Sequence, residues 1–462
     1  MSTTAAPAPE KWIRPLPDPA WDPKRFPPSL HHNRIIATAL LQHDPVGQLT
    51  GARDKIGPVY TLRMLNHPGG IVCAADLETN REVLTNHELF AAGDAAELIA
   101  PIVGRHSLIL TPSPKHARNR KLLMPPFHGA KIAQWTSAIG DLTEGQLPAL
   151  LESGPLAVRP WAQRLTLDVI LRVVFGIESA ERRDVYRAAL DGLMNPRVAS
   201  IMFLPDPIGR DFGRFSPGGL LAARRKAVDD LLTEEIIARR ADPDAENKED
   251  VLSVLLSARD EDSNGFTDEE LRDELKGLVV AGHETTATAL AWTLHFLAHN
   301  PDKRDKLIAD LDAGSTEYLG AVIKESMRLR APVFDAIRMA TRDTTLGGQP
   351  VPAGALVAAN FCVVHLDPAV WPEPESFIPE RHLVEPGGEK PDPWGLTPFG
   401  GGARRCLGAS LAQLELEVVL AKVLARAVPE PAGPLEPARL LSVTLVPAKG
   451  GRVEFTARSH GA

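Results

Sequence analysis

Residues 399–408 read FGGGARRCLG and place a cysteine, Cys406, in a glycine-rich turn. Residues 409–420, ASLAQLELEVVL, carry leucines at helical spacing, which predicts a helix directly after the turn. The thiol would then lie at the positive end of a helix dipole, beside Arg404 and Arg405. Both features lower the pKa of a thiol and favour the thiolate, the form that binds a metal ion. The stretch therefore predicts a metal-binding cysteine.

Three further residues of this stretch suit a flat, apolar ligand. Gly402 fits a backbone position that needs a positive φ, and Gly408 lets such a ligand approach the helix closely. Phe399 can cover the sulfur with an apolar ring. The alternative is a buried structural cysteine in a glycine loop, as most lone cysteines of cytosolic chains are.

The same stretch resembles the Phe-x-x-Gly-x-Arg-x-Cys-x-Gly signature of the cytochrome P-450 family. The resemblance implies that Cys406 is the axial thiolate ligand of the iron of haem b, the expected cofactor. It also implies a mainly α fold with a smaller β-rich part, in which haem lies between a long central helix and the helix after the cysteine. It implies haem contacts for Phe399, Gly400, Arg404 and Gly408.

The composition narrows the class of protein. The formal net charge of −8, from 51 basic and 59 acidic residues in 462, argues against a nucleic-acid binder. Cys73, Cys362 and Cys406 lie too far apart for a Cys-x-x-Cys site and are odd in number, which indicates a reducing cytoplasm. The first thirty residues contain no apolar run, so we expect no signal peptide and no membrane anchor. We expect residues 1–30 to form a proline-rich surface arm and residues 31–462 a single domain.

Hydrophobic periodicity and turn residues predict the elements along the chain. A hairpin is expected with strands at 59–64 and 71–73 and its turn at residues 67–70, which read HPGG. Helices are expected at 76–89, 116–123, 165–175, 220–240, 301–312 and 317–329, a shaped loop at 91–114, and short strands at 344–346, 355–358 and 442–446.

The longest predicted helix begins with the capping box Thr267-Asp268-Glu269-Glu270 and ends at Asn300-Pro301. Its length of roughly 48 Å at 1.5 Å per residue would cross a whole domain. Inside it, residues 281–286 read AGHETT, and a glycine and two threonines are poor choices for a helix interior. A threonine hydroxyl bonded to a carbonyl one turn back would open a groove in which metal-bound oxygen could lie. The alternative is a kinked helix with a surface glutamate.

This hexapeptide lies about 120 residues before the cysteine, as does the oxygen-activating motif of the cytochrome P-450 family. The resemblance implies that Thr285 hydrogen-bonds oxygen at the iron and that Glu284 helps to deliver protons. It places Ala281 and Gly282 against the haem.

Four basic side chains are candidates for binding the haem propionates. His116 and Arg120 are four residues apart on one predicted helix face, and two cations make a clamp for carboxylates. The alternative is a solvated basic face. The resemblance implies propionate contacts for both, and for Arg338 and Arg404. Many soluble bacterial members of the family have histidine at the last of these positions, so Arg404 is a departure.

Glu325 and Arg328, three apart on a helix, would by themselves be an ordinary exposed pair. The resemblance implies instead a buried structural network with Arg381 of the Pro-Glu-Arg segment at 379–381. His382 follows where the family usually has phenylalanine.

The resemblance implies a monooxygenase that inserts one atom of O2 into an apolar small molecule, by hydroxylation or epoxidation of a terpenoid, steroid or fatty-acid-like substrate. Thiolate donation to iron favours O–O cleavage. No flavin or nicotinamide fingerprint follows a predicted strand, so we expect a separate ferredoxin with its NAD(P)H reductase, docking near Arg118, Lys121 and Arg405. The alternatives are a peroxygenase or isomerase, whose family members usually lack the acid–threonine pair, and a haem sensor without turnover.

Family position implies an apolar substrate pocket lined by Ala289, Val333, Phe334 and Thr444. Asp335 is the polar exception: it could contact a polar or cationic group of the substrate, or it could cap a turn. Residues 193–219, rich in Met, Phe, Pro and Gly, are interpreted as a mobile lid over the pocket, with a loop packed on the core as the alternative.

Overall fold

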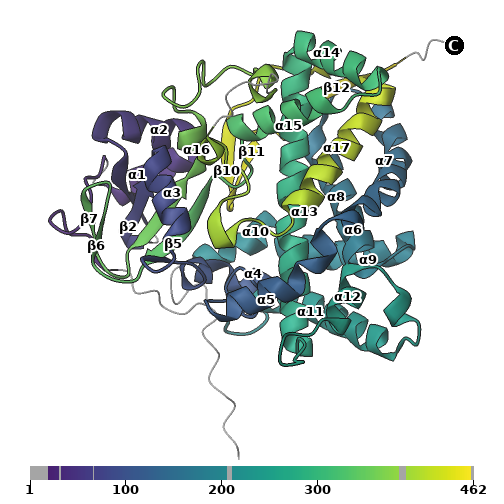
Figure 1. The fold of residues 1–462 in the computed structure, drawn as a ribbon, viewed down its shortest axis with the longest axis horizontal. Helices are drawn as coiled ribbons and strands as arrows, with labels where there is room; N and C mark the ends of the chain where they lie inside the picture. The colour runs from purple at the N-terminus through teal and green to yellow at the C-terminus, as the bar shows by residue number, and fades with distance from the viewer. Residues whose placement is uncertain (1–18, 31–32, 66, 205–210, 384–391, 459–462) are drawn as a thin grey trace, which may run out of the picture.

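Helix α13 (Asp268–His299) forms the axis of the helical part of the molecule (Figure 1). In this computed structural model, which describes residues 19–30, 33–65, 67–204, 211–383 and 392–458, the helix has the predicted bounds. Thr267 accepts a hydrogen bond from the Glu270 N–H, and the Glu270 carboxylate accepts one from the Thr267 N–H. Every side chain from 286 to 298 is buried, so the second half of α13 is a core helix.

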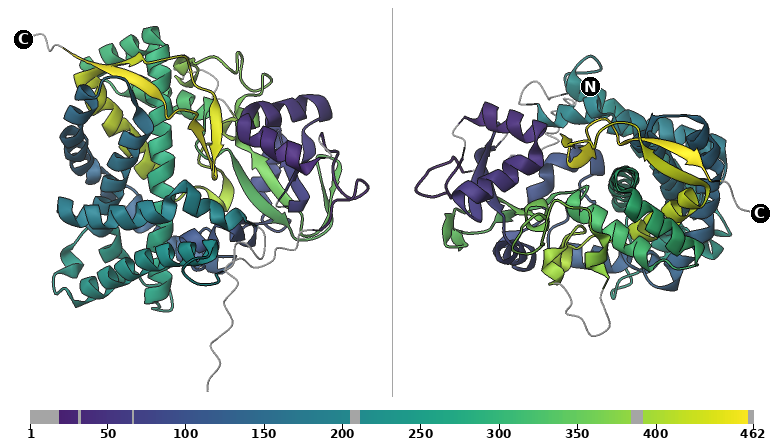
Figure 2. Two further views of the ribbon diagram at one scale, coloured as in Figure 1. Left: turned by 180° about the vertical axis from the view of Figure 1, so that it is seen from behind. Right: turned by 90° about the horizontal axis from the view of Figure 1, so that it is seen from above.

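Other helices surround α13, and Figure 2 shows it end-on inside them. The largest hydrophobic core of the described residues lies among them. They include α5 (Lys115–Leu123), α7 (Trp135–Glu152), α8 (Val158–Phe175), α9 (Ala180–Met194), α11 (Pro217–Ala241), α12 (Val251–Ser257), α14 (Pro301–Asp312), α15 (Glu317–Leu329) and α17 (Ala409–Arg426). The shorter α4 (Ala100–Val103), α6 (Ala130–Ala133), α10 (Pro196–Ala199) and α16 (Phe361–His365) lie in the connections.

A five-stranded sheet forms the smaller part, beside the helices (Figure 1). Its order is β1 (Val59–Met64), β2 (His67–Ala74), β8 (Leu356–Asn360), β5 (Asp335–Ala340) and β3 (Phe90–Ala91). Only β2 and β8 are parallel within it. The helices α1 (Arg34–His43), α2 (Pro45–Ile56) and α3 (Leu77–Thr85) pack on it.

Three small sheets complete the described strands. They are β4 (Leu156–Ala157), β12 (Arg452–Ala457) and β9 (Ala427–Pro431); β10 (Ala438–Leu441) and β11 (Thr444–Pro447); and β6 (Thr344–Leu346) and β7 (Gln349–Val351). The mainly α fold with a smaller β-rich part is therefore confirmed.

The predicted hairpin is present, but its predicted turn is wrong. Residues 67–70 belong to β2 and do not form the turn. The register of β1 and β2 shifts between Leu62 and Met64, which marks a bulge. Gly70 lies opposite this irregularity with φ +81°, and a Cβ there would lie 2.8 Å from the Leu62 carbonyl oxygen. The glycine at position 70 therefore allows the two strands to approach each other closely.

Two predicted segments are only partly covered by the structure. Of the N-terminal arm, residues 1–18 lie outside the described residues; near its end, Phe26 is buried in the core of the sheet. Of the predicted lid, residues 205–210 lie outside the described residues. The part before them packs on the core through Ile201, whereas Phe212 and Phe215 beyond them are exposed. Over the described ranges, no helix is both long enough and apolar enough to cross a lipid bilayer.

Candidate active site

The Cys406 loop is a closed turn packed on the end of α3. The Cys406 N–H donates to the Phe399 carbonyl at 2.9 Å, which ties the two ends of the loop together. Gly402 has φ +65°, and a Cβ there would lie 2.3 Å from the Leu84 carbonyl oxygen. The prediction that Gly402 needs a positive φ is confirmed. A Cβ at Gly408 would meet no atom within 4 Å, so the start of α17 is open to a ligand.

The Cys406 thiol does not have the lowered pKa expected from its position. Burial raises its pKa, and the Gly408 N–H, Arg405 and Arg120 lower it without offsetting that effect. The helix end and the arginines act in the predicted direction, but loss of hydration dominates. The side chain is nevertheless accessible. A metal ion that binds this sulfur would displace the proton, so the raised pKa does not exclude ligation.

The middle of α13 has an unusual accessible stripe. Ala281 is exposed and Gly282 and Thr285 are half-buried, although the helix is otherwise largely buried after residue 286. The Thr285 hydroxyl donates to the Ala281 carbonyl oxygen at 2.6 Å, as predicted for a bond one turn back. Such a bond leaves the hydroxyl oxygen free to accept another hydrogen bond.

Glu284 points towards α8 and makes no hydrogen bond to Thr285 among the described contacts. Its carboxylate forms an ion pair with Arg159 and accepts a hydrogen bond from Gln163 at 2.8 Å. Gly282 also faces α8, since a Cβ on it would lie 2.5 Å from Ile170 Cδ1. The position of Gly282 thus serves helix packing, and its predicted haem contact stays a prediction.

Five basic side chains converge beside the Cys406 loop. Burial, followed by Arg404 and Arg120, lowers the pKa of His116 to about 4. Burial lowers the pKa of Arg404 to about 10, with further lowering by Arg338 and Arg120. Within the described part of the chain, no ion pair joins any member of this set to a carboxylate. The members of this set, called the cation cluster, are Arg120, Arg338 and Arg404, which carry the positive charge, and His87 and His116, whose pKa values are lowered.

The cation cluster has the donors that two carboxylates need. Arg338 Nε is buried without a hydrogen-bond partner, and burial lowers the pKa of Arg338 to about 10, opposed by Asp335. Arg404 is held by the carbonyls of Leu108 and Thr111 at 3.2 and 2.8 Å, which orients its guanidinium. An anion with two carboxylates, such as the propionates of haem, fits this excess of positive charge.

His87 was not predicted. It follows α3, and its Nε2 lies 3.4 Å from the backbone N–H of Ala403, which donates to it. Burial, followed by Arg338 and Arg404, lowers the pKa of His87 and so disfavours its protonated form. A single histidine after a short helix carries no sequence signal, because only the fold brings it to the Cys406 loop.

Glu325 forms the predicted buried network and gains a partner. Arg328 donates to it at 2.8 and 2.9 Å, Arg381 at 3.1 Å, and the Ile378 N–H at 2.9 Å. His382 Nε2 lies 2.8 Å from the carboxylate, so the departure from phenylalanine adds a hydrogen bond. Burial alone would raise the pKa of Glu325, but the hydrogen bonds lower it to about 2.

This Glu325 network reaches the Cys406 loop through His365. Arg328 donates to the His365 carbonyl at 2.7 Å, and His365 Nε2 accepts the Thr397 N–H at 3.0 Å. Thr397 lies two residues before Phe399, so α15 positions the start of the loop.

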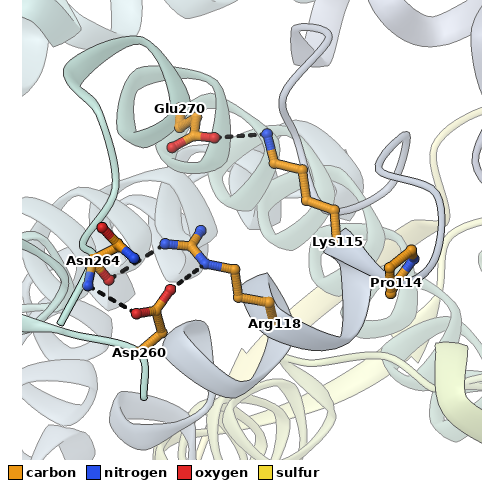
Figure 3. Close-up of a pocket in the computed structure, with 6 residues that line it drawn as sticks. All are labelled: Pro114, Lys115, Arg118, Asp260, Asn264 and Glu270. Carbon is orange, nitrogen blue, oxygen red and sulfur yellow. Dashed lines mark hydrogen bonds and ion pairs between the residues drawn. The ribbon is translucent and has the colours of Figure 1, made fainter. Parts of the chain in front are cut away.

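Two of the three cations expected to dock a ferredoxin form ion pairs within the protein. Arg118 donates to Asp260 at 2.6 Å, and Lys121 pairs with Glu261 at 2.6 Å. Figure 3 shows Arg118 within an open surface pocket that is also lined by Pro114, Lys115, Asp260, Asn264 and Glu270. Arg405 is exposed, and in the described chain no ion pair engages it.

The predicted substrate residues lie on three segments, which are α13, the segment before β5 and β11, and a hydrogen bond joins the last two. Ala289 is buried on α13. The Leu445 N–H of β11 donates to the Pro332 carbonyl at 2.9 Å, which joins β11 to the segment before β5. That segment holds half-buried Val333 and buried Phe334, and Thr444 is buried on β11.

Comparison with known proteins agrees with this geometry. A family model described as Cytochrome P450 matches residues 27–453. The chain belongs to the cytochrome P450 family. It is 34% identical over 442 residues to cytochrome P450 135B1 of Mycobacterium tuberculosis, covering 94% of this chain and 92% of the relative. It is 34% identical over 439 residues to cytochrome P450 137 of the same organism, covering 93% and 91%.

Solved cytochrome P450 structures share the fold. A structure described as retinoic acid bound cyanobacterial CYP120A1 has a TM-score of 0.80 at 23% identity, covering 94% of this chain and all of that one. The haem domain of cytochrome P450DA has a TM-score of 0.80 at 21% identity, covering 96% and 99%.

Cytochromes P450 bind haem b and are haem monooxygenases, and this chain is an oxidoreductase of that type. Its own residues fit the cofactor on two independent grounds. Cys406 is an accessible thiol at the open start of α17. The cation cluster, with the unpartnered Nε of Arg338, lacks the anions that propionates supply.

Proposed function

We propose that this cytochrome P450 hydroxylates or epoxidises an apolar terpenoid, steroid or fatty-acid-like molecule with O2 and electrons from a separate ferredoxin and its NAD(P)H reductase. The observation that carries the proposal is the accessible stripe of α13. Thr285 presents a hydroxyl there, one residue from the acid Glu284. A haem-containing sensor or carrier without turnover needs no such pair.

Bound haem would supply the reductive activation of O2 and the transfer of one oxygen atom to the substrate. Cys406 is the residue that would ligate its iron, and the thiolate would donate electron density that favours O–O cleavage. The cation cluster would hold the propionates, with the guanidinium of Arg404 already oriented by two backbone carbonyls. Phe399 and Gly400 would lie against the same cofactor.

The protons that O2 reduction consumes would pass through Thr285 and Glu284. The Thr285 hydroxyl donates to the Ala281 carbonyl oxygen, so its own oxygen can accept a hydrogen bond from a water molecule and position that water for proton transfer. Glu284 is held by Arg159 and Gln163 on the α8 side. For Glu284 to serve Thr285, its carboxylate would first have to release Arg159.

The pocket that this function needs is apolar. Ala289, Val333, Phe334 and Thr444 are its proposed lining, and the packed segment around Ile201 with the exposed segment from Phe212 would form its lid. Burial of apolar substrate surface contributes about 25 cal/mol per Å², so an apolar molecule binds such walls with little need for polar contacts.

Electrons would enter on the side of the Cys406 loop. Arg405 lies next to the proposed iron ligand and is exposed, so an acidic ferredoxin could dock there. Arg118 and Lys121 are weaker candidates than the sequence indicated, since Asp260 and Glu261 already neutralise them. The buried free thiols of Cys73 and Cys362 support residence in the reducing cytoplasm.

The test is NAD(P)H consumption by the haem-loaded enzyme with a surrogate ferredoxin and reductase, with and without candidate apolar substrates. We expect substrate-dependent consumption and oxygenated product. Thr285→Ala should lower product formed per NAD(P)H about tenfold or more, and Thr285→Ser, which keeps the hydroxyl, should retain most of it. Peroxide-driven turnover that is faster than reductase-driven turnover and survives Thr285→Ala would favour a peroxygenase. Consumption that never responds to a substrate would favour a sensor.

A further inference from the structure

Among the described residues, Asp335 is an acid without a partner that directly follows Val333 and Phe334, two residues proposed to line the apolar pocket. It is the first residue of β5, where it pairs with Asn360 of β8, and its side chain is half-buried. Over the part of the chain that the structure describes, its carboxylate makes no hydrogen bond and no ion pair. It accepts no backbone N–H, so it is not the turn cap that remained an alternative from the sequence. Asp76, by contrast, caps α3 by accepting the Thr79 N–H at 2.8 Å.

The neighbours of Asp335 do not neutralise it. Arg338 is three residues further along β5, so the alternation of a strand places it on the opposite face, where it joins the cation cluster. Asn360 Nδ2 is buried and has no hydrogen-bond partner. The thiols of Cys73 and Cys362 lie nearby, and burial raises the pKa of each, that of Cys73 to about 12.

The face of β5 that carries Asp335 is otherwise apolar. Ile337 and Met339 follow on it at strand spacing, and both are half-buried. They pack with Ala95, from the short helix η1 (Asp94–Ile99), in one hydrophobic cluster. At the other end, Phe334 packs with Leu445 of β11. A single carboxylate therefore stands at the end of an apolar wall.

We propose that Asp335 determines substrate specificity by binding a protonated amine, so that the preferred substrate is an apolar molecule with one basic nitrogen. This inference rests on the proposed function, which places the start of β5 beside the substrate pocket. The ammonium N–H would donate to the carboxylate in a charge-assisted hydrogen bond. The ammonium group would supply the positive charge that Asp335 lacks among the described residues. A neutral group in place of the amine would leave the carboxylate charge unpaired in a partly buried position, which lowers affinity.

Burial raises the pKa of Asp335 to about 7, with Arg338 opposing the shift. Amine binding requires the ionised carboxyl, so amine affinity should increase as pH rises through about 7 while the amine stays protonated. The other titratable groups near Asp335 are Arg338, whose charge acts from the other face of β5, Cys73 on β2 and Cys362 on α16. Each of them keeps one protonation state between pH 6 and 8, since their pKa values lie far from 7.

The experiment is equilibrium dialysis of the haem-loaded enzyme against N,N-dimethyldecylamine and against N,N-dimethyldecanamide, a neutral molecule of similar size. Decyltrimethylammonium, which cannot coordinate iron, is the third probe and separates carboxylate binding from iron binding. We expect the wild type at pH 8 to bind the protonated amine about tenfold to a hundredfold more tightly than the amide. The quaternary cation, which has the charge but no N–H, should bind less tightly than the amine and more tightly than the amide. Asp335→Asn should abolish this preference and the pH dependence, and leave amide affinity unchanged. Asp262→Asn, an exposed acid before α13, is the matched control and should behave as wild type.

Equal affinities of the wild type for cations and amide would overturn the inference, as would a preference that survives Asp335→Asn. The ferrous carbon monoxide spectrum of each variant verifies that it has folded and holds haem through the thiolate. Dialysis needs no turnover, so the inference can fail while NAD(P)H-driven oxidation of neutral substrates succeeds. Amine binding can likewise be found in a protein that fails the turnover test, which separates the two outcomes.

Discussion

Glu325 is the centre of the buried network that reaches the Cys406 loop through Arg328 and His365. Its side chain and that of Arg328 are both fully buried. A buried carboxylate is stable only when donors replace the water that it has lost, and here Arg328, Arg381, His382 and a backbone N–H do so. Removing one donor leaves part of a buried charge unsatisfied, so the cost exceeds the value of an ordinary hydrogen bond.

His382→Phe restores the residue that the family usually has and removes one donor from Glu325. We expect the free energy of unfolding of the haem-loaded enzyme to fall by about 1–3 kcal/mol, measured by urea denaturation at pH 7. Lys226→Met, which breaks the exposed pair with Asp230, is the control and should change it by less than about 1 kcal/mol. An unchanged or increased stability of His382→Phe would show that the hydrogen bond contributes nothing.

The lowered pKa of Glu325 predicts a specific acid sensitivity. Because its pKa is about 2 in the folded chain and about 4.5 unfolded, its stabilising contribution is complete above pH 4.5 and is lost as pH falls through 2. The shift corresponds to about 3 kcal/mol. We expect Glu325→Gln to be less stable than wild type at pH 6 and to lose less stability between pH 4.5 and 2.5, in urea titrations. Parallel pH profiles would contradict this account.

At the scale of elements, the middle of α13 packs closely against α8. Gly282 lets the two helices approach, His283 Nδ1 lies 2.9 Å from Thr166 Oγ1, and Glu284 pairs with Arg159. Three consecutive residues of the AGHETT stretch thus contact α8, while Ala281 and Thr285 remain accessible. The same hexapeptide serves helix packing on one face and the proposed chemistry on another.

Gly282→Ala tests the packing half of this interpretation. The added Cβ would lie 2.5 Å from Ile170 Cδ1, so we expect a loss of about 1–3 kcal/mol in the free energy of unfolding. Ile170→Val removes that atom, and the double variant should recover much of the loss. Gly320→Ala, on α15 with no atom within 4 Å of the added Cβ, is the control and should be neutral or stabilising. Additive losses in the double variant would contradict the contact.

The helices that were predicted well are those whose ends are marked by residues within the helix itself or next to it. The bounds of α13, α14 and α15 follow from a capping box, a proline at the first turn and helical periodicity, all within a few residues. The hairpin turn was wrong because residues 67–70 have the composition of a turn, while the bulge that needs Gly70 is a property of strand pairing. Composition cannot distinguish the two.

The parts of the site that could not be predicted depend on contacts between distant segments. Thr285 could be assigned its hydrogen bond to Ala281 from helix geometry alone. His87 reaches the Cys406 loop, and Asp260 neutralises Arg118, only because the fold closes distances of more than a hundred residues in sequence. The raised pKa of Cys406 was missed because it depends on how distant segments pack around the sulfur, which the neighbouring residues along the chain do not show.

At the scale of the whole molecule, the distribution of charge limits where a redox partner can dock. With Arg118 and Lys121 paired, Arg405 is the exposed basic residue of the predicted set that is free to meet an acidic protein, within the described chain. Docking at this point would bring electrons to the loop that holds the proposed iron ligand.

Arg405→Glu should slow reduction of the haem by an acidic ferredoxin about fivefold or more at low salt, and weaken the dependence of that rate on ionic strength. The measurement is stopped-flow reduction across a salt series. Arg197→Glu, an exposed residue on α10, has the same charge change and should leave the rate near wild type. Equal effects of the two variants would mean that only net charge matters and that docking lies elsewhere.

The central claim is that Cys406, as thiolate, holds the iron of haem in this fold. The most direct measurement is the absorption spectrum of the reduced, carbon monoxide-bound protein for the wild type, for Cys406→Ala and for the controls Cys73→Ser and Cys362→Ser. The account predicts the strongly red-shifted Soret band of a thiolate complex in the wild type and both controls, and its loss in Cys406→Ala alone. A wild type without that band, or a Cys406→Ala variant that keeps it, would contradict the account.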